Sequence, residues 1–164
     1  MMSKLRLLFG TPKTKDKKAF LEALREAQDK QGCVIQAMDA SVMVSERHAT
    51  FAAEKAARAF AEKRNVAKDL GLEILRYASG QRQIERALSM GVSETSERVA
   101  LIVMENGISL EASDIIDLDD AGPRWNREAV KEAFEIGDAE IEAAGEERIP
   151  DLVLERVALT DAYR

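Results

Sequence analysis

The chain has 164 residues, of which 46% are hydrophobic and 33% are charged. This length fits a single domain (residues 1–164) that buries a core of its own. No apolar run approaches the roughly 20 residues of a membrane-spanning helix. Cys33 is the sole cysteine, so an internal disulfide is excluded. We therefore expect a cytoplasmic protein without a membrane partner.

Charge is distributed unevenly along the chain. The formal net charge is −6, yet residues 1–90 carry 17 Lys and Arg against 11 Asp and Glu. Residues 91–164 carry 7 against 19. This asymmetry predicts one surface that meets phosphate and another that meets a protein, or simply a solvated surface with an acidic end.

The first part of the chain alternates between strand and helix patterns. Strand patterns cover residues 4–10 and 33–40, and helix patterns cover residues 11–30 and 45–64. Thr11 is the predicted N-cap of the first helix, with Pro12 in the first helical position, where its missing N–H costs nothing. Ser45 is the predicted N-cap of the second helix, whose alanine stripe permits close approach of a neighbouring element.

Two further helical patterns, over residues 68–79 and 81–90, are separated by Gly80. The sequence "RVALIVMEN" at residues 98–106 is a continuous apolar run, which predicts a strand in the centre of a sheet.

The chain turns acidic beyond Gly107. Residues 114–118 suit a short edge strand, residues 126–144 one or two helices interrupted near Gly137, and residues 152–159 a closing helix or strand. Together these patterns predict an α+β domain. Its small mixed, mainly antiparallel β-sheet would have about four strands packed with several helices.

Catalytic chemistry has few candidate residues. A Cys33–His48 dyad is conceivable, but Cys33 opens an apolar strand, where a buried inert thiol is commoner, and His48 is expected to be an exposed polar residue. One His and one Cys exclude a zinc set. Residues 117–128 approach a calcium loop, but Ala121 stands where an oxygen ligand is required. We expect no catalytic residues, no metal and no cofactor.

Four lysines crowd the start of the first predicted helix, where the helix dipole disfavours cations. They are Lys13, Lys15, Lys17 and Lys18. They indicate either an anionic partner or a solvated loop.

The break at Ser79 and Gly80 is the most informative stretch. A helix that restarts here has free N–H groups suited to a phosphate, and Gly80 lets the backbone approach it. Arg82 adds a guanidinium, and Gln81 or Gln83 can contact a base edge. The preceding polar residues are Arg64, Asn65, Lys68 and Arg76. Alternatively, Glu73 pairs with Arg76 or Arg82 and merely stabilises the turn.

Three stretches carry a family resemblance: residues 48–92, with the core "LEILRYASGQRQIERAL", "VALIV" at 99–103, and "LVLERVALTDAY" at 152–163. With these the chain resembles the small kinase-binding, tRNA-recruiting subunit of the KEOPS (EKC) complex, the PRPK-binding protein family. Residues 107–126 match least.

The resemblance implies a non-catalytic subunit that supports threonylcarbamoyladenosine modification of tRNA. Its partners would be the kinase-like ATPase subunit, the tRNA 3′ CCA end and, indirectly, the threonylcarbamoyl transferase subunit. The expected RNA-binding residues are Arg64, Asn65, Lys68, Arg76, Ser79, Gly80, Gln81, Arg82 and Gln83.

Leu159 and Tyr163 are the expected protein-partner interface, because a terminal segment has few neighbours of its own domain to cover it. Two alternatives stay open. One is a pure protein-interaction module that regulates the kinase-like subunit without RNA contact. The other is a stand-alone enzyme of unknown chemistry.

Overall fold

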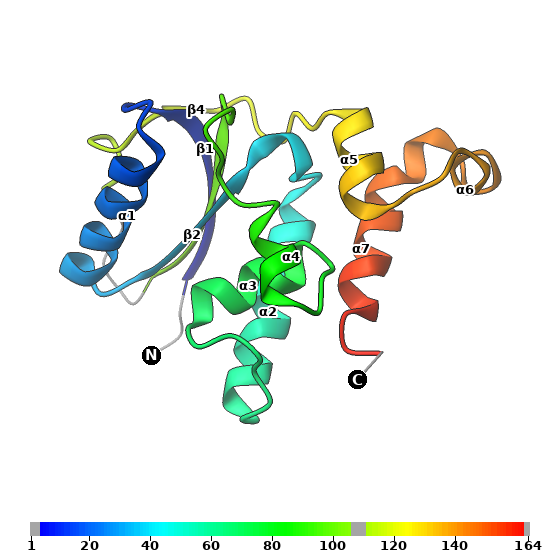
Figure 1. Ribbon diagram of the computed structural model, residues 1–164, viewed down its shortest axis with the longest axis horizontal. Coiled ribbons are helices and arrows are strands. Elements are labelled where there is room, and N and C mark those ends of the chain that lie inside the picture. The colour runs from blue at the N-terminus through cyan, green and yellow to red at the C-terminus, as the bar shows by residue number, and fades with distance from the viewer. Residues whose placement is uncertain (1–3, 106–110, 163–164) are drawn as a thin grey trace.

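The computed structural model describes residues 4–105 and 111–162, and a β-sheet forms its centre (Figure 1). Within these residues the sheet has four strands in the order β2 (Val34–Asp39), β3 (Val99–Glu105), β1 (Lys4–Pro12), β4 (Ile116–Asp119). Each neighbouring pair is antiparallel. The predicted α+β fold is confirmed, with the apolar run in an interior strand and the acidic segment supplying an edge strand.

The sheet is covered on both faces by helices. Along β3, Ala100 and Ile102 join one hydrophobic cluster, whereas Leu101 and Val103 join another, because successive side chains of a strand point to opposite faces. Helix α1 (Lys17–Gln31) contributes Phe20 and Leu24 to the second cluster. Helices α2 (Glu46–Ala61) and α3 (Leu70–Ala78) pack on the other face, opposite α1 (Figure 1).

The beginning of α1 differs from the prediction. Thr11 and Pro12 do not start the helix but continue β1, where Pro12 pairs with Ile116 of β4. The N-cap is Asp16, whose carboxylate accepts hydrogen bonds from the amides of Lys18 and Ala19. Capping by Asp16 and pairing of β1 with β4 both outweigh the local Thr-Pro signal.

Helix α2 begins as the sequence predicts. The Ser45 hydroxyl caps it by accepting a hydrogen bond from the His48 amide at 3.0 Å. Its alanine stripe, including Ala49, Ala52 and Ala56, is fully buried. These small side chains bring α2 close to α3, so the predicted close approach is confirmed.

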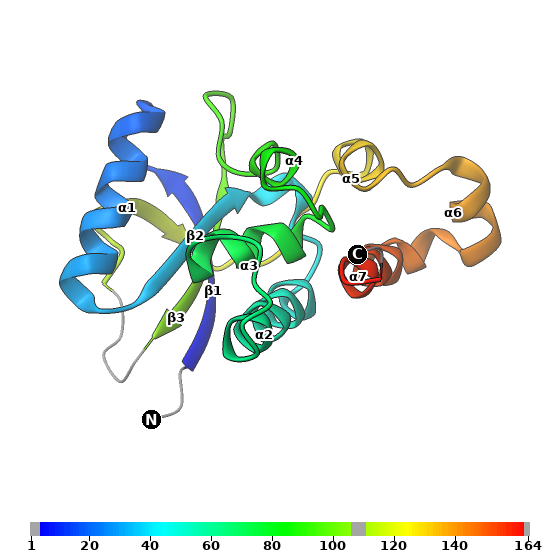
Figure 2. The same ribbon diagram turned by 60° about the horizontal axis from the view of Figure 1, so that its bottom comes forward.

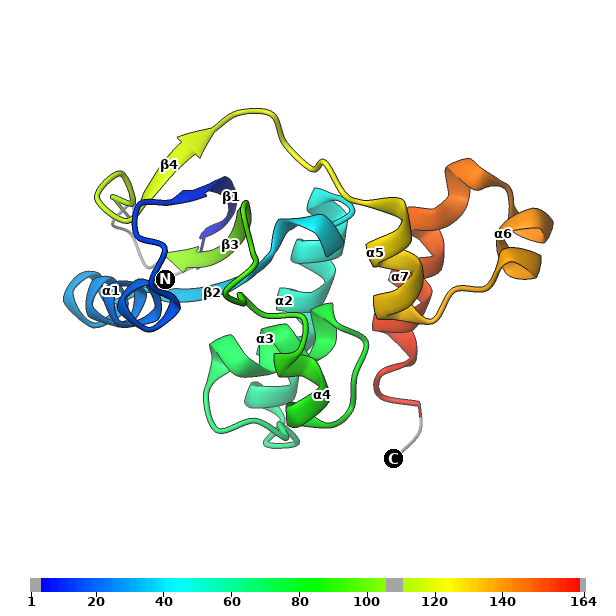
Figure 3. The ribbon, with the colours of Figure 1, turned by 45° about the horizontal axis from the view of Figure 1, so that its top comes forward.

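The C-terminal part is entirely helical within the described residues. It comprises α5 (Arg127–Phe134), α6 (Asp138–Ala144), a 3₁₀ turn η2 (Glu146–Arg148) and α7 (Ile149–Leu159). Helix α7 packs against α2, whereas α6 lies farther from the sheet (Figures 2 and 3). The segment interrupted near Gly137 is therefore two helices, and the closing segment is a helix.

Candidate functional site

The turn after α3 is held by its own hydrogen bonds. The amide of Ser79 donates to the carbonyl oxygen of Leu75 at 2.9 Å, and that of Gly80 donates to Tyr77 at 3.0 Å. The amide of Gln81 donates to the Arg76 carbonyl at 3.2 Å and faces the Ser79 hydroxyl at 3.3 Å. These three amides are therefore engaged within the turn and are not presented to a ligand.

The helix after the turn is shorter than predicted. Helix α4 covers only Ile84–Leu88, so Gln81, Arg82 and Gln83 precede it instead of forming its first turn. The predicted phosphate seat at a helix N-terminus beginning at Gln81 is consequently wrong. Arg82 and Gln83 are exposed and Gln81 is half-buried, so these residues offer side chains from a loop.

Gly80 is required by packing against α7. Its φ of 67° is left-handed, and a Cβ at this position would lie 3.1 Å from the Cβ of Arg156. Arg156 donates to both carboxylate oxygens of Glu140 at 2.8 Å and to the Phe134 carbonyl at 2.9 Å. Gly80 thus allows α3 to end in contact with Arg156, whose hydrogen bonds link α5, α6 and α7.

Arg76 is part of a buried ion pair. Its Nε donates to Oε1 of Glu73 at 3.0 Å, and its Nη2 donates to Oε2 at 3.2 Å. The Glu73 carboxylate also accepts from the amides of Val66 and Ala67. The alternative in which Glu73 pairs with Arg76 is confirmed. Because Arg76 is only 2% exposed and Ser79 is buried, neither belongs to the surface that a partner meets.

The remaining predicted residues precede α3. Arg64 lies 2.5 Å from a carboxylate oxygen of Glu62, and the side-chain amide of Asn65 donates to the Ala67 carbonyl at 2.9 Å. Lys68 is exposed. Nine residues of α3, about 13 Å of helix, separate this group from Arg82. The structure therefore divides the predicted RNA-binding set between the two ends of α3.

A cavity of about 490 Å³ adjoins the loop before α4. Gln81 and Arg86 line one side of it, and Glu132 and Glu135 of the α5 region line another. Arg86 was not among the predicted residues, although it lies four positions after Arg82. The mixed charge of the lining suits a polar ligand better than an apolar one.

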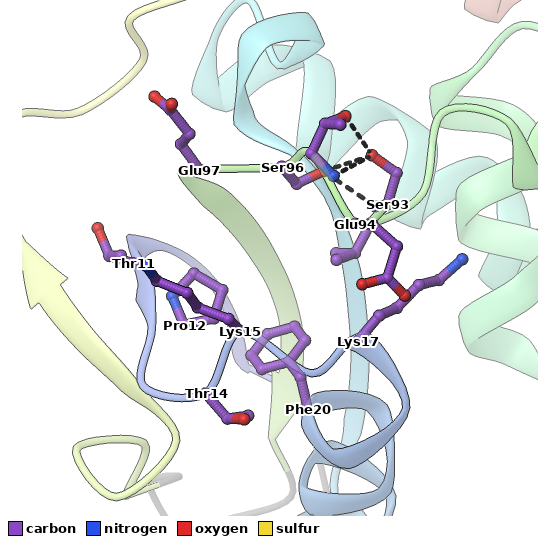
Figure 4. Close-up of a pocket in the computed structure, with 12 residues that line it drawn as sticks. Thr11, Pro12, Thr14, Lys15, Lys17, Phe20, Ser93, Glu94, Ser96 and Glu97 are labelled. Carbon is purple, nitrogen blue, oxygen red and sulfur yellow. Dashed lines mark hydrogen bonds between the residues drawn. The ribbon is translucent and has the colours of Figure 1, made fainter.

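A second cavity, of about 470 Å³, lies at the start of α1 (Figure 4). Lys15 and Lys17 line it from one side, the loop containing Ser93 and Ser96 from another, and Phe20 also contributes to the wall. The Asp16 carboxylate caps the helix here and supplies a negative charge to its N-terminus. This cap explains from within the chain why lysines are tolerated in the first turn.

Cys33 and His48 do not form a dyad. Cys33 belongs to the hydrophobic cluster under α1, and burial followed by the charge of Glu105 raises the pKa of its thiol. His48 is fully buried, not exposed as predicted, and one ring nitrogen lies 2.7 Å from the Ala78 carbonyl. Its other nitrogen accepts from the Val44 amide at 3.2 Å. Burial lowers the pKa of His48 to about 4, so the ring is neutral near pH 7.

The described part of the chain has neither a cluster of metal-ligating side chains nor a helix that could span a membrane. In residues 4–105 and 111–162 no group of three His, Cys, Asp or Glu side chains is arranged to hold a metal ion. None of the helices in the same residues has the length and apolar character needed to cross a membrane.

The C-terminal helix divides its apolar residues between core and surface. Leu152 and Val157 are buried, whereas Leu159 is 39% exposed. Tyr163, the other predicted interface residue, lies outside the described residues. Just beyond α7, Asp161 accepts a hydrogen bond from the hydroxyl of Tyr77 at 2.6 Å.

Comparison with known families gives one match that spans most of the chain. The family described as kinase binding protein CGI-121 matches residues 13–161. A search of the curated proteins found no match. The matched range includes the whole of α1 to α7, both ends of α3 and the exposed Leu159.

Proposed function

The chain belongs to the CGI-121 family of kinase-binding proteins, and we propose that it is a non-catalytic KEOPS subunit. In this role it binds the kinase-like ATPase subunit and the 3′ CCA end of tRNA, and supports threonylcarbamoyladenosine modification in the cytoplasm. The transferase subunit is then reached indirectly, through the ATPase. The observation that carries this proposal is the family match over residues 13–161.

A non-catalytic role agrees with the positions of the two most reactive side-chain types. Cys33 and His48 lie in separate hydrophobic surroundings, and His48 uses both ring nitrogens on the backbone. A nucleophile and its base must lie within hydrogen-bond reach of each other and of substrate. The pair therefore gives no support to a stand-alone enzyme.

RNA contact is assigned to exposed and half-buried side chains and not to helix amides. Lys68 and Arg82 supply positive charge, and Gln81 and Gln83 supply hydrogen-bonding groups for an unpaired base. Arg64 and Asn65 extend this surface before α3. Single-stranded RNA ends expose both phosphates and base edges, which such a mixed set of side chains can contact.

Kinase contact is assigned to the exposed end of α7. Leu159 presents an apolar side chain there, while Val157, two residues earlier and so on the opposite side of the helix, remains in the core. Tyr163 completes this proposed interface.

Two binding assays with matched variants test the proposal. In a gel shift, Arg82→Glu should abolish most binding of tRNA, whereas Arg148→Glu, an exposed charge reversal beside α7, should change it little. Both variants should still bind the kinase-like subunit in a pull-down. Removing CCA from the tRNA should weaken the wild type about as much as Arg82→Glu does. Equal binding of intact and truncated tRNA would contradict the RNA assignment.

A second candidate function is a protein-interaction module without RNA contact. It is favoured by the engaged amides of residues 79–81 and by the burial of Arg76, which remove predicted RNA contacts. In that case the pull-down succeeds with every variant, and no tRNA is shifted by the wild type.

A further inference from the structure

Three donors from separate segments converge on one carboxylate near the C-terminus. The Tyr77 hydroxyl of α3 donates to Oδ1 of Asp161 at 2.6 Å. Lys55 of α2 lies 3.5 Å from the other carboxylate oxygen, and Arg64, before α3, lies 3.8 Å from Oδ1. The side chains of Lys55, Arg64 and Asp161 are between 23% and 29% exposed, whereas Tyr77 is buried, so the cluster borders on solvent on the side of its charged groups.

The donors are held in place by contacts other than Asp161. The Lys55 ammonium lies 5.4 Å from the ring centroid of Phe51 and 5.8 Å from that of Tyr77, within the range of a cation–π contact. The Tyr77 ring is fully buried, and Arg64 also pairs with Glu62. A site preorganised in this way keeps its shape when its acceptor is exchanged.

The acceptor in this cluster is replaceable by a phosphate. Carboxylate and phosphate oxygens accept hydrogen bonds from ammonium, guanidinium and hydroxyl groups in similar geometry. Asp161 lies two residues beyond the exposed Leu159, in a turn after the end of α7, whereas the three donors belong to the α2–α3 unit. The carboxylate can therefore leave without unfolding the elements that carry the donors.

We propose that Lys55, Arg64 and Tyr77 form an anion-binding site that Asp161 fills in the free protein, and that an RNA phosphodiester takes its place when the tRNA end binds. This inference rests on the proposed function for its ligand. Arg64 precedes Asn65 and Lys68 in the segment before α3, which places the site beside the proposed RNA surface. Lys55 is thereby added to the proposed RNA-binding residues, and Asp161 becomes the group that the RNA displaces. The sequence did not indicate either residue, because both lie far along the chain from residues 79–83.

Removing the charge of Asp161 tests this competition. Asp161→Asn weakens the internal occupant, so it should tighten tRNA binding about fivefold, the effect expected for two partly exposed ion pairs. Glu155→Gln removes one negative charge from the exposed face of α7 and serves as the matched control. It should alter affinity less than twofold. In a Lys55→Met background, Asp161→Asn should bring a smaller gain, because one of the two cations for which Asp161 and the phosphate compete is absent.

A second arm uses inorganic pyrophosphate, so that the site is tested without RNA. Its titration into the wild type, followed by NMR, should shift the Asp161 amide signal, and Asp161→Asn should bind it about fivefold more tightly. If tRNA binds but Asp161→Asn matches Glu155→Gln, the inference is overturned and the proposed function stands. If pyrophosphate binds as expected but tRNA does not bind at all, the RNA assignment and the proposed function fail together. No response to either probe overturns the site itself.

Discussion

The two ends of α3 are stabilised by different chemistry. At its N-terminal end, Asp69 accepts from the Leu72 amide at 2.8 Å, and the Glu73 carboxylate accepts from the amides of Val66 and Ala67. At its C-terminal end, the neutral ring of His48 lies 2.7 Å from the Ala78 carbonyl, and Gly80 packs on α7. One end thus depends on charged acceptors and the other on an uncharged donor and a close backbone contact.

The capping of the two ends follows from the polarity of a helix, whereas the amides that Glu73 binds belong to the loop before α3. The first turn of a helix leaves amides without partners, which carboxylates satisfy, whereas its last turn leaves carbonyls, which need donors. A cation would suit the C-terminal dipole, but complete burial of His48 outweighs that preference and keeps the ring neutral. The exposed cations Lys68 and Arg82 lie in the loops before and after α3.

The largest effect is expected at the charged end. Glu73→Ala leaves the buried Arg76 without its carboxylate and frees two backbone amides, so it should reduce the free energy of unfolding by about 3–5 kcal/mol. Glu54→Ala, in an exposed ion pair with Arg47, should change it by no more than about 0.5 kcal/mol. Urea denaturation measures both variants. Similar small losses in the two would show that the charged end does not depend on Glu73.

Low pH should destabilise the protein through His48, at the C-terminal end of α3. The pKa of this ring is lowered from 6.5 to about 4 by burial, so protons bind the unfolded chain first as the pH falls. Stability contributed by the neutral ring is complete above pH 6.5 and should decline by roughly 3 kcal/mol down to pH 4. Urea denaturation across this pH range measures the slope. His48→Gln should flatten this part of the profile, and an unchanged profile in that variant would assign the acid sensitivity elsewhere.

Gly80→Ala separates backbone conformation from packing. Gly32 has nearly the same φ, 64°, but no atom lies within 4 Å of where its Cβ would be. Gly32→Ala should therefore cost about 1 kcal/mol for the left-handed conformation alone. Gly80→Ala should cost about 2 kcal/mol, because its Cβ also meets Arg156. Thermal melting of the two variants measures this difference in stability. Equal losses of stability would show that the contact with α7 does not add to the cost of Gly80→Ala.

The smallest change in stability is expected at the outer end of α7, which is the packing partner of Gly80. Leu159→Glu should alter the free energy of unfolding by about 0.5 kcal/mol or less, since the side chain is exposed. It should nonetheless weaken binding to the kinase-like subunit about tenfold if this side chain anchors the interface. Leu118→Glu, on the exposed face of β4, is the matched control. Calorimetric titration with the kinase-like subunit measures the affinity of both variants. Equal affinities of Leu159→Glu and Leu118→Glu would contradict the assignment of Leu159 to the interface.

Local signals predicted the fold well where one residue type has one dominant role. Ser45 before a helical stripe, Gly32 at a helix end and the apolar run of β3 all lie where expected. Thr11 and Pro12 misled because strand pairing with β4, which is distant in sequence, overrode a plausible cap. Burial of His48 could not be predicted, because its carbonyl partner at Ala78 lies 30 residues away.

The site was predicted less completely than the fold, because burial of its side chains also depends on partners that are distant in sequence. Spacing identified the junction at residues 79–83 but not which of its polar groups face inward. Arg76 and Lys68 are both cations near α3, yet only the tertiary position of Glu73 decides that Arg76 is buried. The α7 contact of Gly80 likewise depends on a helix that begins almost 70 residues later in the chain.

The pairing of β1 has a consequence for how the chain is made. Lys4 of β1 pairs with Glu105 of β3, and β1 has no neighbour in the sheet that is closer in sequence. During synthesis at about 5–20 residues per second, β1 therefore waits roughly 5–20 seconds before its first partner strand exists. Non-local pairing of this kind also slows folding, because a long loop must close before any strand contact forms. The first strand thus stays unpaired until β3 has been made, although it lies in the interior of the finished sheet.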